Sequence, residues 1–270
     1  MIQLTPEDIS KIINLAIASL QVKSLKIPHM SLRPNIHIIM YGSVGSTKST
    51  ILYNVSKNLK GNVIKGLTKA NLYGIVDKDG DVIPPTIWDC FGSFLFIDEY
   101  HISGSDRHAK DLLNSLLSDM ENPEYDKKIS FKARPFNEGD KKFYCKVEKG
   151  RLKVRTRFGL FLNTMMPITS LDINEVRALC SRCLCIPIFP TEQDLEKIAD
   201  GYHLYVFDDI KVKRENVVIK KEAYDAIKGF VKAAGVSKEH YLRRIGDLCR
   251  AFAVLGKIDE EVFNLILSLP

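Results

Sequence analysis

A glycine-rich segment that ends in Lys-Ser combines the residue types that bind phosphate. The backbone N–H groups of such a loop surround the phosphates, and the amino end of the helix that follows adds a partial positive charge. The Lys48 amine is expected to reach the β- and γ-phosphates, and the Ser49 hydroxyl is expected to ligate Mg²⁺. The segment therefore predicts a nucleoside triphosphate site, whose expected ligands are Gly42, Ser43, Val44, Gly45, Ser46, Thr47, Lys48, Ser49 and Thr50.

One position departs from the usual pattern of a phosphate-binding loop. Thr47 stands where a second glycine normally precedes the lysine, and threonine is bulkier in a loop that must approach phosphate closely. A chance Gly/Ser turn before a lysine is the alternative interpretation. The motifs elsewhere in the chain favour the phosphate loop.

A pair of carboxylates follows the continuous apolar run of residues 93–97. Such a run is typical of a buried parallel strand, whose carboxyl end would place Asp98 and Glu99 beside the phosphates. Asp98 is expected to hold the Mg²⁺ shell, and Glu99 to polarise the attacking water. A solvated acidic strand end is the alternative interpretation.

Three further polar residues are of types that act on a γ-phosphate. Asn163 follows the apolar run 158–162, where an amide can orient water. Arg182 and Arg243 are arginines of the kind that offset transition-state charge. Arginines are common on protein surfaces, so an ordinary surface position is the preferred interpretation of each one alone, and only their order along the chain favours the catalytic role for both.

These residues are expected at the ends of alternating strands and helices. The alternation predicts an α/β fold in which helices flank a parallel sheet. We expect an α/β core over residues 1–191 and a small helical domain over residues 192–270. The expected strands lie at 36–41, 93–97, 158–162 and 184–189, and the expected helices begin at Thr5 and cover 107–120, 192–200, 220–234 and 238–255.

A basic segment lies within the expected core. Residues 127–157 hold twelve Lys/Arg and three acidic residues, a net charge of +9, which leaves −3 for the remaining chain. Such a concentration of positive charge indicates a polyanionic partner. Alternating residues at 141–157 predict a β-hairpin that turns at Lys149-Gly150, and a solvated hairpin without a ligand is the alternative. The candidate contacts to a nucleic-acid backbone are Lys146, Lys149, Arg151, Lys153 and Arg155.

Composition restricts the class of protein. The chain has 270 residues, of which 45% are hydrophobic, as in an ordinary globular protein. No apolar run approaches the ~18 residues of a membrane span, and the first residues lack a signal-peptide pattern. A cytoplasmic location is therefore expected, in the cytoplasm of a host cell if the chain is encoded by a virus or plasmid. Cys180-x-x-Cys183-x-Cys185 has a spacing that zinc could use, but buried free thiols on a strand are the preferred interpretation.

Taken together, these motifs resemble the AAA+ ATPases, and within them the minichromosome maintenance (MCM) replicative helicases. The resemblance covers roughly residues 33–260, with the motifs in order. Members of that family typically carry alanine before the Walker A lysine, so a residue other than glycine has a precedent there. The matching segments are 33–49 (Walker A), 66–70 (Gly-Leu-Thr-Ala), 76–82 (helix-2 insert), 92–100 (Walker B), 106–109 (next helix), 157–163 (sensor 1), 178–183 (arginine finger) and Arg243 to Arg250 (sensor 2).

The resemblance implies an AAA+ core with a helical lid, which binds ATP and Mg²⁺ between the subunits of a homo-oligomeric, hexameric ring. It also implies that hairpin 141–157 points into the central channel and contacts DNA, and it suggests replication proteins as partners. The N-terminal DNA-binding and zinc-bearing domain of MCM proteins has no counterpart in this sequence, so a stand-alone motor module is expected. The implied catalytic residues are Glu99 and Asn163 of one subunit and Arg182 and Arg243 of its neighbour.

Three functions remain open from the sequence. The first is a motor in which ATP hydrolysis drives translocation on DNA and unwinding in replication. The second is a replication initiator or helicase loader that uses ATP as an assembly switch and hydrolyses it slowly. The third is a binding module whose nucleotide site Thr47 has inactivated. The intact Lys48, Ser49, Asp98, Glu99 and Arg182 argue against the third.

Overall fold

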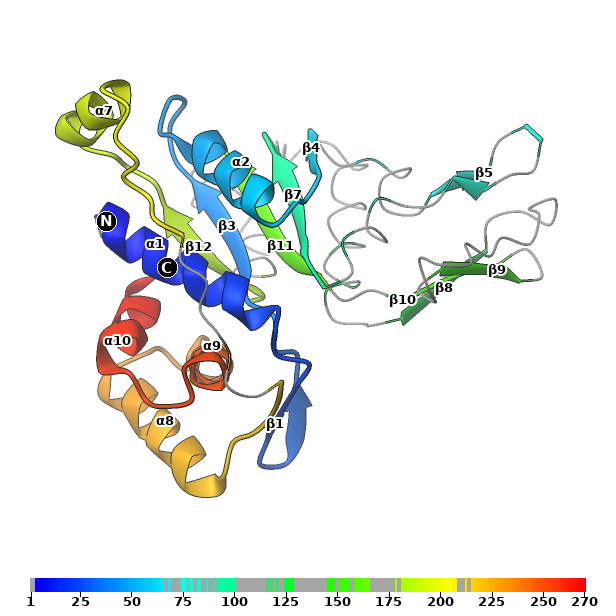
Figure 1. Ribbon diagram of the computed structural model, residues 1–270. Coiled ribbons are helices and arrows are strands. Elements are labelled where there is room, and N and C mark those ends of the chain that lie inside the picture. The colour runs from blue at the N-terminus through cyan, green and yellow to red at the C-terminus, as the bar shows by residue number, and fades with distance from the viewer. Residues whose placement is uncertain are drawn as a thin grey trace.

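Within the described part of the chain, five parallel strands form the central sheet (Figure 1). Every pair of neighbouring strands in this sheet is parallel. The predicted α/β fold with a parallel sheet flanked by helices is therefore confirmed. The order across the sheet is β12 (Cys183–Pro187), β3 (His37–Tyr41), β11 (Gly159–Thr164), β7 (Phe94–Asp98) and β4 (Val63–Lys65).

The structure is a computed structural model. At residues 76, 82, 124–128, 145–148 and 152–155 the description is limited to the backbone. The described residues are 3–65, 68, 74–76, 78–79, 82–83, 86, 90, 92–100, 116, 118, 120, 124–128, 145–148, 151–155, 158–165, 178, 181–207, 212 and 215–270.

Both faces of the central sheet are buried, which explains why its strands are continuous apolar runs. Successive residues of a strand point to opposite faces, and accordingly Ile38 belongs to one apolar cluster and Ile39 to the other. The first cluster also contains residues of α1 (Pro6–Ser19) and α2 (Lys48–Asn58). Helix α2 begins directly after the loop at 42–47 and packs on β7 and β11.

Helix α1 begins where the sequence predicts. The Thr5 hydroxyl accepts a hydrogen bond from the Asp8 N–H at 3.1 Å, and the Asp8 carboxylate accepts one from the Thr5 N–H at 3.1 Å. This reciprocal pair satisfies two N–H groups at the start of the helix. Helix α1 packs against β3 on one side and against the C-terminal helices on the other.

The C-terminal region is mostly helical, as predicted. The helices expected at 192–200, 220–234 and 238–255 are present with shorter bounds, and the last helix was not predicted. Residues of the last three helices share one apolar cluster with α1 and the central sheet, whereas the first has no buried residue. The four helices are α7 (Glu192–Ala199), α8 (Lys221–Ala233), α9 (Tyr241–Leu255) and α10 (Glu260–Ser268).

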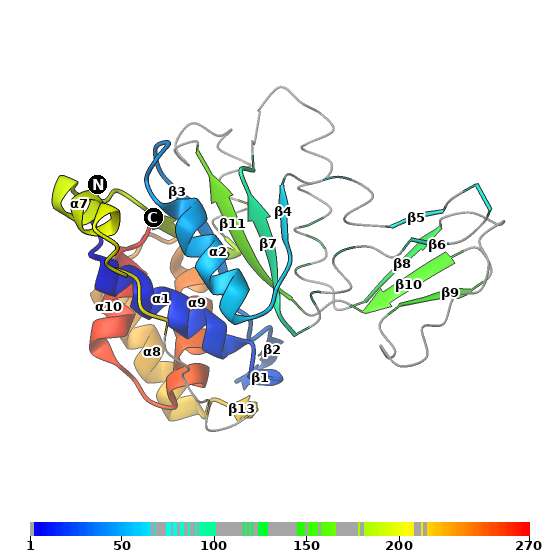
Figure 2. The ribbon, with the colours of Figure 1, turned by 45° about the horizontal axis from the view of Figure 1, so that its top comes forward.

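A second sheet, of antiparallel strands, includes the predicted basic hairpin. Strand β9 (Cys145–Glu148) pairs with β10 (Arg151–Arg155), as the alternation of the sequence predicted. Strand β8 (Glu124–Lys128) pairs with the other edge of β10 and was not predicted. In Figures 1 and 2 this sheet lies on the opposite side of the core from α8–α10.

Two small sheets complete the described strands. One has the order β13 (Asn216–Val218), β1 (Ser24–Ile27) and β2 (Met30–Leu32), and the other pairs β5 (Ile75–Val76) with β6 (Val82–Ile83).

Some sequence predictions fall on residues that the structure does not describe. These are the segment 106–109 and most of the helix expected at 107–120, most of the segment 66–70, residues 77, 80 and 81 of the segment 76–82, the hairpin turn at Lys149-Gly150, and Cys180. Among the residues that are described, no helix is long and apolar enough to cross a bilayer.

The imidazole of His37, the first residue of β3, makes folding stability depend on pH. Its Nδ1 accepts a hydrogen bond from the Leu160 N–H at 2.9 Å. Burial, reinforced by the charges of Arg250, Arg33 and Arg182, lowers the pKa of His37 from 6.5 to about 3. The folded state therefore favours the neutral ring, and this stabilisation is complete above pH 6.5 and is lost as the pH falls from 6.5 towards 3.

We expect the free energy of unfolding to fall by up to about 1.4 kcal/mol per pH unit through this one group as the pH is lowered from 6.5 to 4. Urea unfolding followed by circular dichroism between pH 7 and pH 4 measures the slope. The His37→Asn variant keeps an oxygen that can accept from the Leu160 N–H but does not titrate, so its slope should be shallower. Equal slopes for the two proteins would contradict the assignment.

Candidate functional site

The carboxyl ends of three neighbouring strands and the amino end of α2 meet around one cavity. The strands are β3, β11 and β7, whose parallel pairing brings their ends to the same edge of the sheet. The cavity has a volume of about 120 Å³. Its lining combines the expected lysine, serine, carboxylates and amide with two residues that were not predicted, Thr164 and Met165. The lining residues are Val44, Gly45, Lys48, Ser49, Asp98, Glu99, Asn163, Thr164 and Met165.

One carboxylate oxygen connects the parts of this site. Asp98 Oδ1 accepts hydrogen bonds from Ser49 Oγ at 2.9 Å, from Asn163 Nδ2 at 3.0 Å and from the Glu99 N–H at 3.2 Å. Asp98 is 3% exposed, and such donors are what make a buried carboxylate tolerable. The Ser49 hydroxyl and the Asp98 carboxylate are hard oxygen ligands within hydrogen-bonding distance of each other. They fit a Mg²⁺ ion, which would take the place of the hydrogen bond between them.

Lys48 lies buried at the base of the loop. Its Nζ donates to the Gly42 carbonyl at 2.8 Å, the Ser43 carbonyl at 2.7 Å and Ser46 Oγ at 2.8 Å. Burial lowers the pKa of the Lys48 amine, and the charge of Asp98 opposes this shift. All three N–H donors of the ammonium are thus occupied by the loop, and a phosphate must displace some of these contacts to be bound by Lys48.

The loop backbone is held in conformations that constrain residue choice. A Cβ at Gly42 would meet the Ile188 carbonyl oxygen at 2.3 Å, so the loop crosses the end of β12 only with glycine there. Thr47 has φ 67°, and Glu99 has φ 55°, both in the left-handed region. Non-glycine residues rarely adopt this region, and strained residues of this kind concentrate at functional sites.

The other loop residues expected to bind phosphate are distributed around the turn. Val44 is 80% exposed, Ser43 and Gly45 are exposed, and Ser46 is buried against Lys48. Thr50 is exposed on the first turn of α2. Most of these loop residues are therefore accessible from the solvent, and Ser46 is the buried exception.

The two expected catalytic arginines lie at the other end of the sheet. Arg182 precedes β12, whose first residue Cys183 pairs with His37 at the amino end of β3. Arg243 Nη2 donates to the Cys183 carbonyl at 3.2 Å, so it lies at the same end. The five residues of β3 span roughly 16 Å, and they separate both arginines from the loop at 42–49 of the same chain.

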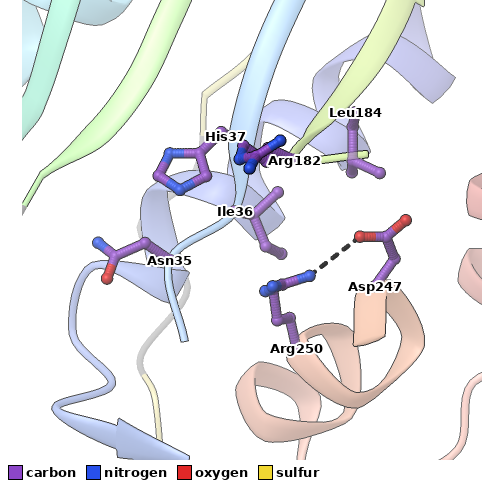
Figure 3. Close-up of a pocket in the computed structure, with 7 residues that line it drawn as sticks. All are labelled: Asn35, Ile36, His37, Arg182, Leu184, Asp247 and Arg250. Carbon is purple, nitrogen blue, oxygen red and sulfur yellow. Dashed lines mark hydrogen bonds and ion pairs between the residues drawn. The ribbon is translucent and has the colours of Figure 1, made fainter. Parts of the chain in front are cut away.

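A small pocket marks this second end of the sheet (Figure 3). Arg182 comes from the chain just before β12, and Arg250 and Asp247 come from α9, where they form an ion pair of 3.1 Å. The Arg182 guanidinium donates to the Ala178 carbonyl at 3.0 Å. The lining residues are Asn35, Ile36, His37, Arg182, Leu184, Asp247 and Arg250.

The sequence patterns did not lead us to predict that Asp247 pairs with the arginines of α9. It lies within 3.6 Å of Arg243 Nε, 3.7 Å of Arg244 Nη1 and 3.1 Å of Arg250 Nη1. Its side chain is 9% exposed, and that of Arg243 is 7% exposed. The available signal was spacing, because all three arginines stand three or four residues from Asp247 on one helix.

In the sheet of β8, β10 and β9, the strand register places acidic residues among the expected DNA contacts. Residues directly opposite each other share a face, so Lys153 shares its face with Lys146 on β9 and Asp126 on β8. Arg151, which is exposed, lies opposite Glu148 and Lys128, and Arg155 lies opposite Glu124. Lys149 lies outside the described residues. Among the described positions, this face carries five basic and three acidic residues.

The cysteines are arranged as buried thiols. Cys183 and Cys185 are free and buried on β12, as the preferred interpretation of their spacing predicted. In the part of the chain that the structure describes, no group of three or more His, Cys, Asp or Glu residues is placed to hold a metal ion.

Comparison of the chain with models of known protein families and with curated protein sequences gives no match.

We expect Asp247→Ala to lower the free energy of unfolding by about 3–5 kcal/mol, because it leaves three largely buried guanidinium groups without their carboxylate. Urea unfolding at pH 7 measures the change. Asp225→Ala, which removes an exposed ion pair with Lys228 on α8, is the matched control and should have no measurable effect. An Asp247→Ala variant as stable as the control would show that the arginines do not depend on Asp247.

Proposed function

We propose that the chain is an ATPase of the AAA+ type, similar to the motor module of MCM helicases, that hydrolyses ATP while bound to DNA. The observation that carries this proposal is the convergence of Lys48, Ser49, Asp98, Glu99 and Asn163 on one cavity at the carboxyl edge of a parallel sheet. The resemblance of the sequence motifs to that family also supports it.

The residues of the cavity would have different roles in phosphoryl transfer. Backbone N–H groups of the loop and the Lys48 amine would bind the β- and γ-phosphates. Ser49 and Asp98 would hold Mg²⁺, which when bound offsets negative charge on the phosphate oxygens. Asn163 would orient a water molecule towards the γ-phosphorus.

Glu99 is suited to act on that water, because it is exposed, lines the cavity, and has no side-chain partner among the described residues. Its carboxylate would accept the water proton as the new O–P bond forms and the bond from the γ-phosphorus to the β-phosphate oxygen breaks. ADP and inorganic phosphate are then the products.

The arginines favour an assembly in which each site is completed by a second copy of the chain. Arg182 lies at the amino edge of the sheet and is separated from its own loop by the length of β3. In a ring of identical subunits the amino edge of one copy can face the carboxyl edge of the next. Arg243 would have to leave Asp247 to reach a neighbour's phosphate, so we propose Arg182 as the primary arginine.

We expect the wild-type protein to hydrolyse ATP in the presence of Mg²⁺, single-stranded DNA to stimulate turnover, and Lys48→Ala to abolish it. Glu99→Gln should bind ATP but hydrolyse it at least about 100-fold more slowly, because it cannot accept the proton. Release of phosphate, measured with and without DNA, tests both variants. A wild-type rate equal to that of Lys48→Ala would overturn the proposed ATPase.

The basic hairpin is the proposed DNA-binding element. Arg151 and Lys153 alternate along β10 and therefore share one face, with Lys146 of β9 on the same face. The acidic residues on this face reduce its net charge, so binding through it should be moderate and directed to the phosphate backbone.

We expect Arg151→Ala with Lys153→Ala to weaken binding of single-stranded DNA and to reduce the slope of log affinity against log salt by roughly 0.7 for each lost contact. Fluorescence anisotropy across a salt titration measures both quantities. Lys127→Ala is the matched control, because Lys127 lies opposite Leu152 and thus on the other face of the same sheet. Equal effects of the double variant and the control would remove the hairpin face from the proposal.

One observation favours a second function, in which ATP acts as an assembly switch of a replication initiator or helicase loader. Thr47 places a β-branched residue in the left-handed region at the phosphate loop, which is expected to slow rearrangements during turnover. DNA binding that requires ATP but not its hydrolysis, measured with Glu99→Gln, would favour the switch over the motor.

A further inference from the structure

Thr47 does not use its hydroxyl in the way that a threonine at this position usually does. It is the N-cap residue of α2, where a threonine side chain normally accepts a hydrogen bond from the second or third N–H of the helix. Thr47 makes no such side-chain bond, and its backbone has φ 67° and ψ 3°. Its Oγ1 lies 3.2 Å from the hydroxyl oxygen of Tyr205 instead.

Tyr205 is held in place by α1. The residue next to it, Val206, donates its N–H to Ser10 Oγ at 3.2 Å and accepts a hydrogen bond at its carbonyl from Asn14 Nδ2 at 3.2 Å. Both of these α1 side chains are buried. Tyr205 itself is half-buried against the main apolar cluster, so its hydroxyl is held in place beside Thr47 Oγ1.

The contact between Thr47 and Tyr205 bears on whether the first N–H groups of α2 are free to bind an anion. The first N–H groups of a helix have no partners within the helix, and in a phosphate-binding loop they are the groups that bind the anion. A threonine that relaxed to the extended conformation of an ordinary N-cap would turn its hydroxyl onto those N–H groups and compete with phosphate. The Tyr205 hydroxyl holds the Thr47 hydroxyl away from them.

We propose that Tyr205 is a positioning residue for the phosphate-binding loop, which keeps Thr47 in the left-handed conformation and so leaves the amino end of α2 open to the phosphates of a nucleotide. The inference rests on the proposed function, because it assumes that the loop at 42–49 binds ATP. It assigns to the segment 201–207, which follows α7, a role in nucleotide affinity that its sequence does not indicate.

The geometry also explains how a residue other than glycine is accommodated at position 47. Glycine adopts the left-handed region without cost, whereas a β-branched residue does so only when its surroundings stabilise it. Tyr205 should therefore matter when residue 47 is threonine and should not matter when it is glycine.

A double-mutant cycle on ATP affinity tests this dependence. We expect Tyr205→Phe to weaken binding of Mg²⁺ with a non-hydrolysable ATP analogue by roughly 2- to 10-fold, the effect of one net hydrogen bond. In the Thr47→Gly background the same change should have no effect. Thr47→Ser, which can also cap α2, should retain the sensitivity to Tyr205→Phe. Isothermal titration calorimetry measures the affinities, and the melting temperature of the nucleotide-free proteins measures folding separately.

Two controls make the outcomes distinguishable. Tyr202→Phe changes a tyrosine of the same segment that is 66% exposed, and it should leave affinity unchanged. Lys48→Ala should abolish binding. If the wild type binds the analogue, Lys48→Ala does not, and Tyr205→Phe has no effect or has the same effect in both backgrounds, the inference on Tyr205 fails while the nucleotide site stands. If the wild type binds no more analogue than Lys48→Ala, the proposed function fails and the inference fails with it.

Discussion

The hydrogen bonds accepted by Asp98 Oδ1 constrain the whole of the candidate site. They join Ser49 of α2, Asn163 of β11 and the backbone of Glu99 to a buried carboxylate at the end of β7. A buried carboxylate needs such donors, so β11 must run parallel to β7 in a register that delivers an amide at this height. A slip of one residue would turn the Asn163 side chain to the opposite face of the sheet and leave Asp98 short of a donor.

The central sheet separates the candidate nucleotide site from the arginines. Its carboxyl edge carries the loop, the carboxylates and the amide, and its amino edge carries Arg182 together with the arginines that surround Asp247. Because parallel strands all point the same way, their carboxyl ends lie at one end of the sheet and their amino ends at the other, separated by the length of a strand. In the proposed assembly, the arginine that completes each nucleotide site comes from a neighbouring copy of the chain.

Several parts of the fold followed from local patterns. Continuous apolar runs predicted β3, β7, β11 and β12, because strands buried on both faces carry no polar alternation. Strand β8 was not predicted, since Glu124–Lys128 is a charged segment that becomes a strand by pairing with β10. That pairing also placed Asp126 and Glu124 beside the basic residues of the hairpin. A net charge summed along the sequence does not reveal which charges share a face.

Residue type and spacing alone determined that Lys48, Ser49, Asp98, Glu99 and Asn163 are chemically competent and that they follow strands, because both properties are local. Only the tertiary structure decided that Asp98 accepts hydrogen bonds from both Ser49 and Asn163, and that the hydroxyl of Tyr205 meets that of Thr47. The last contact joins residues 158 positions apart. Strand order and packing bring such residues together, and these depend on how apolar faces of distant segments fit, which no local pattern encodes.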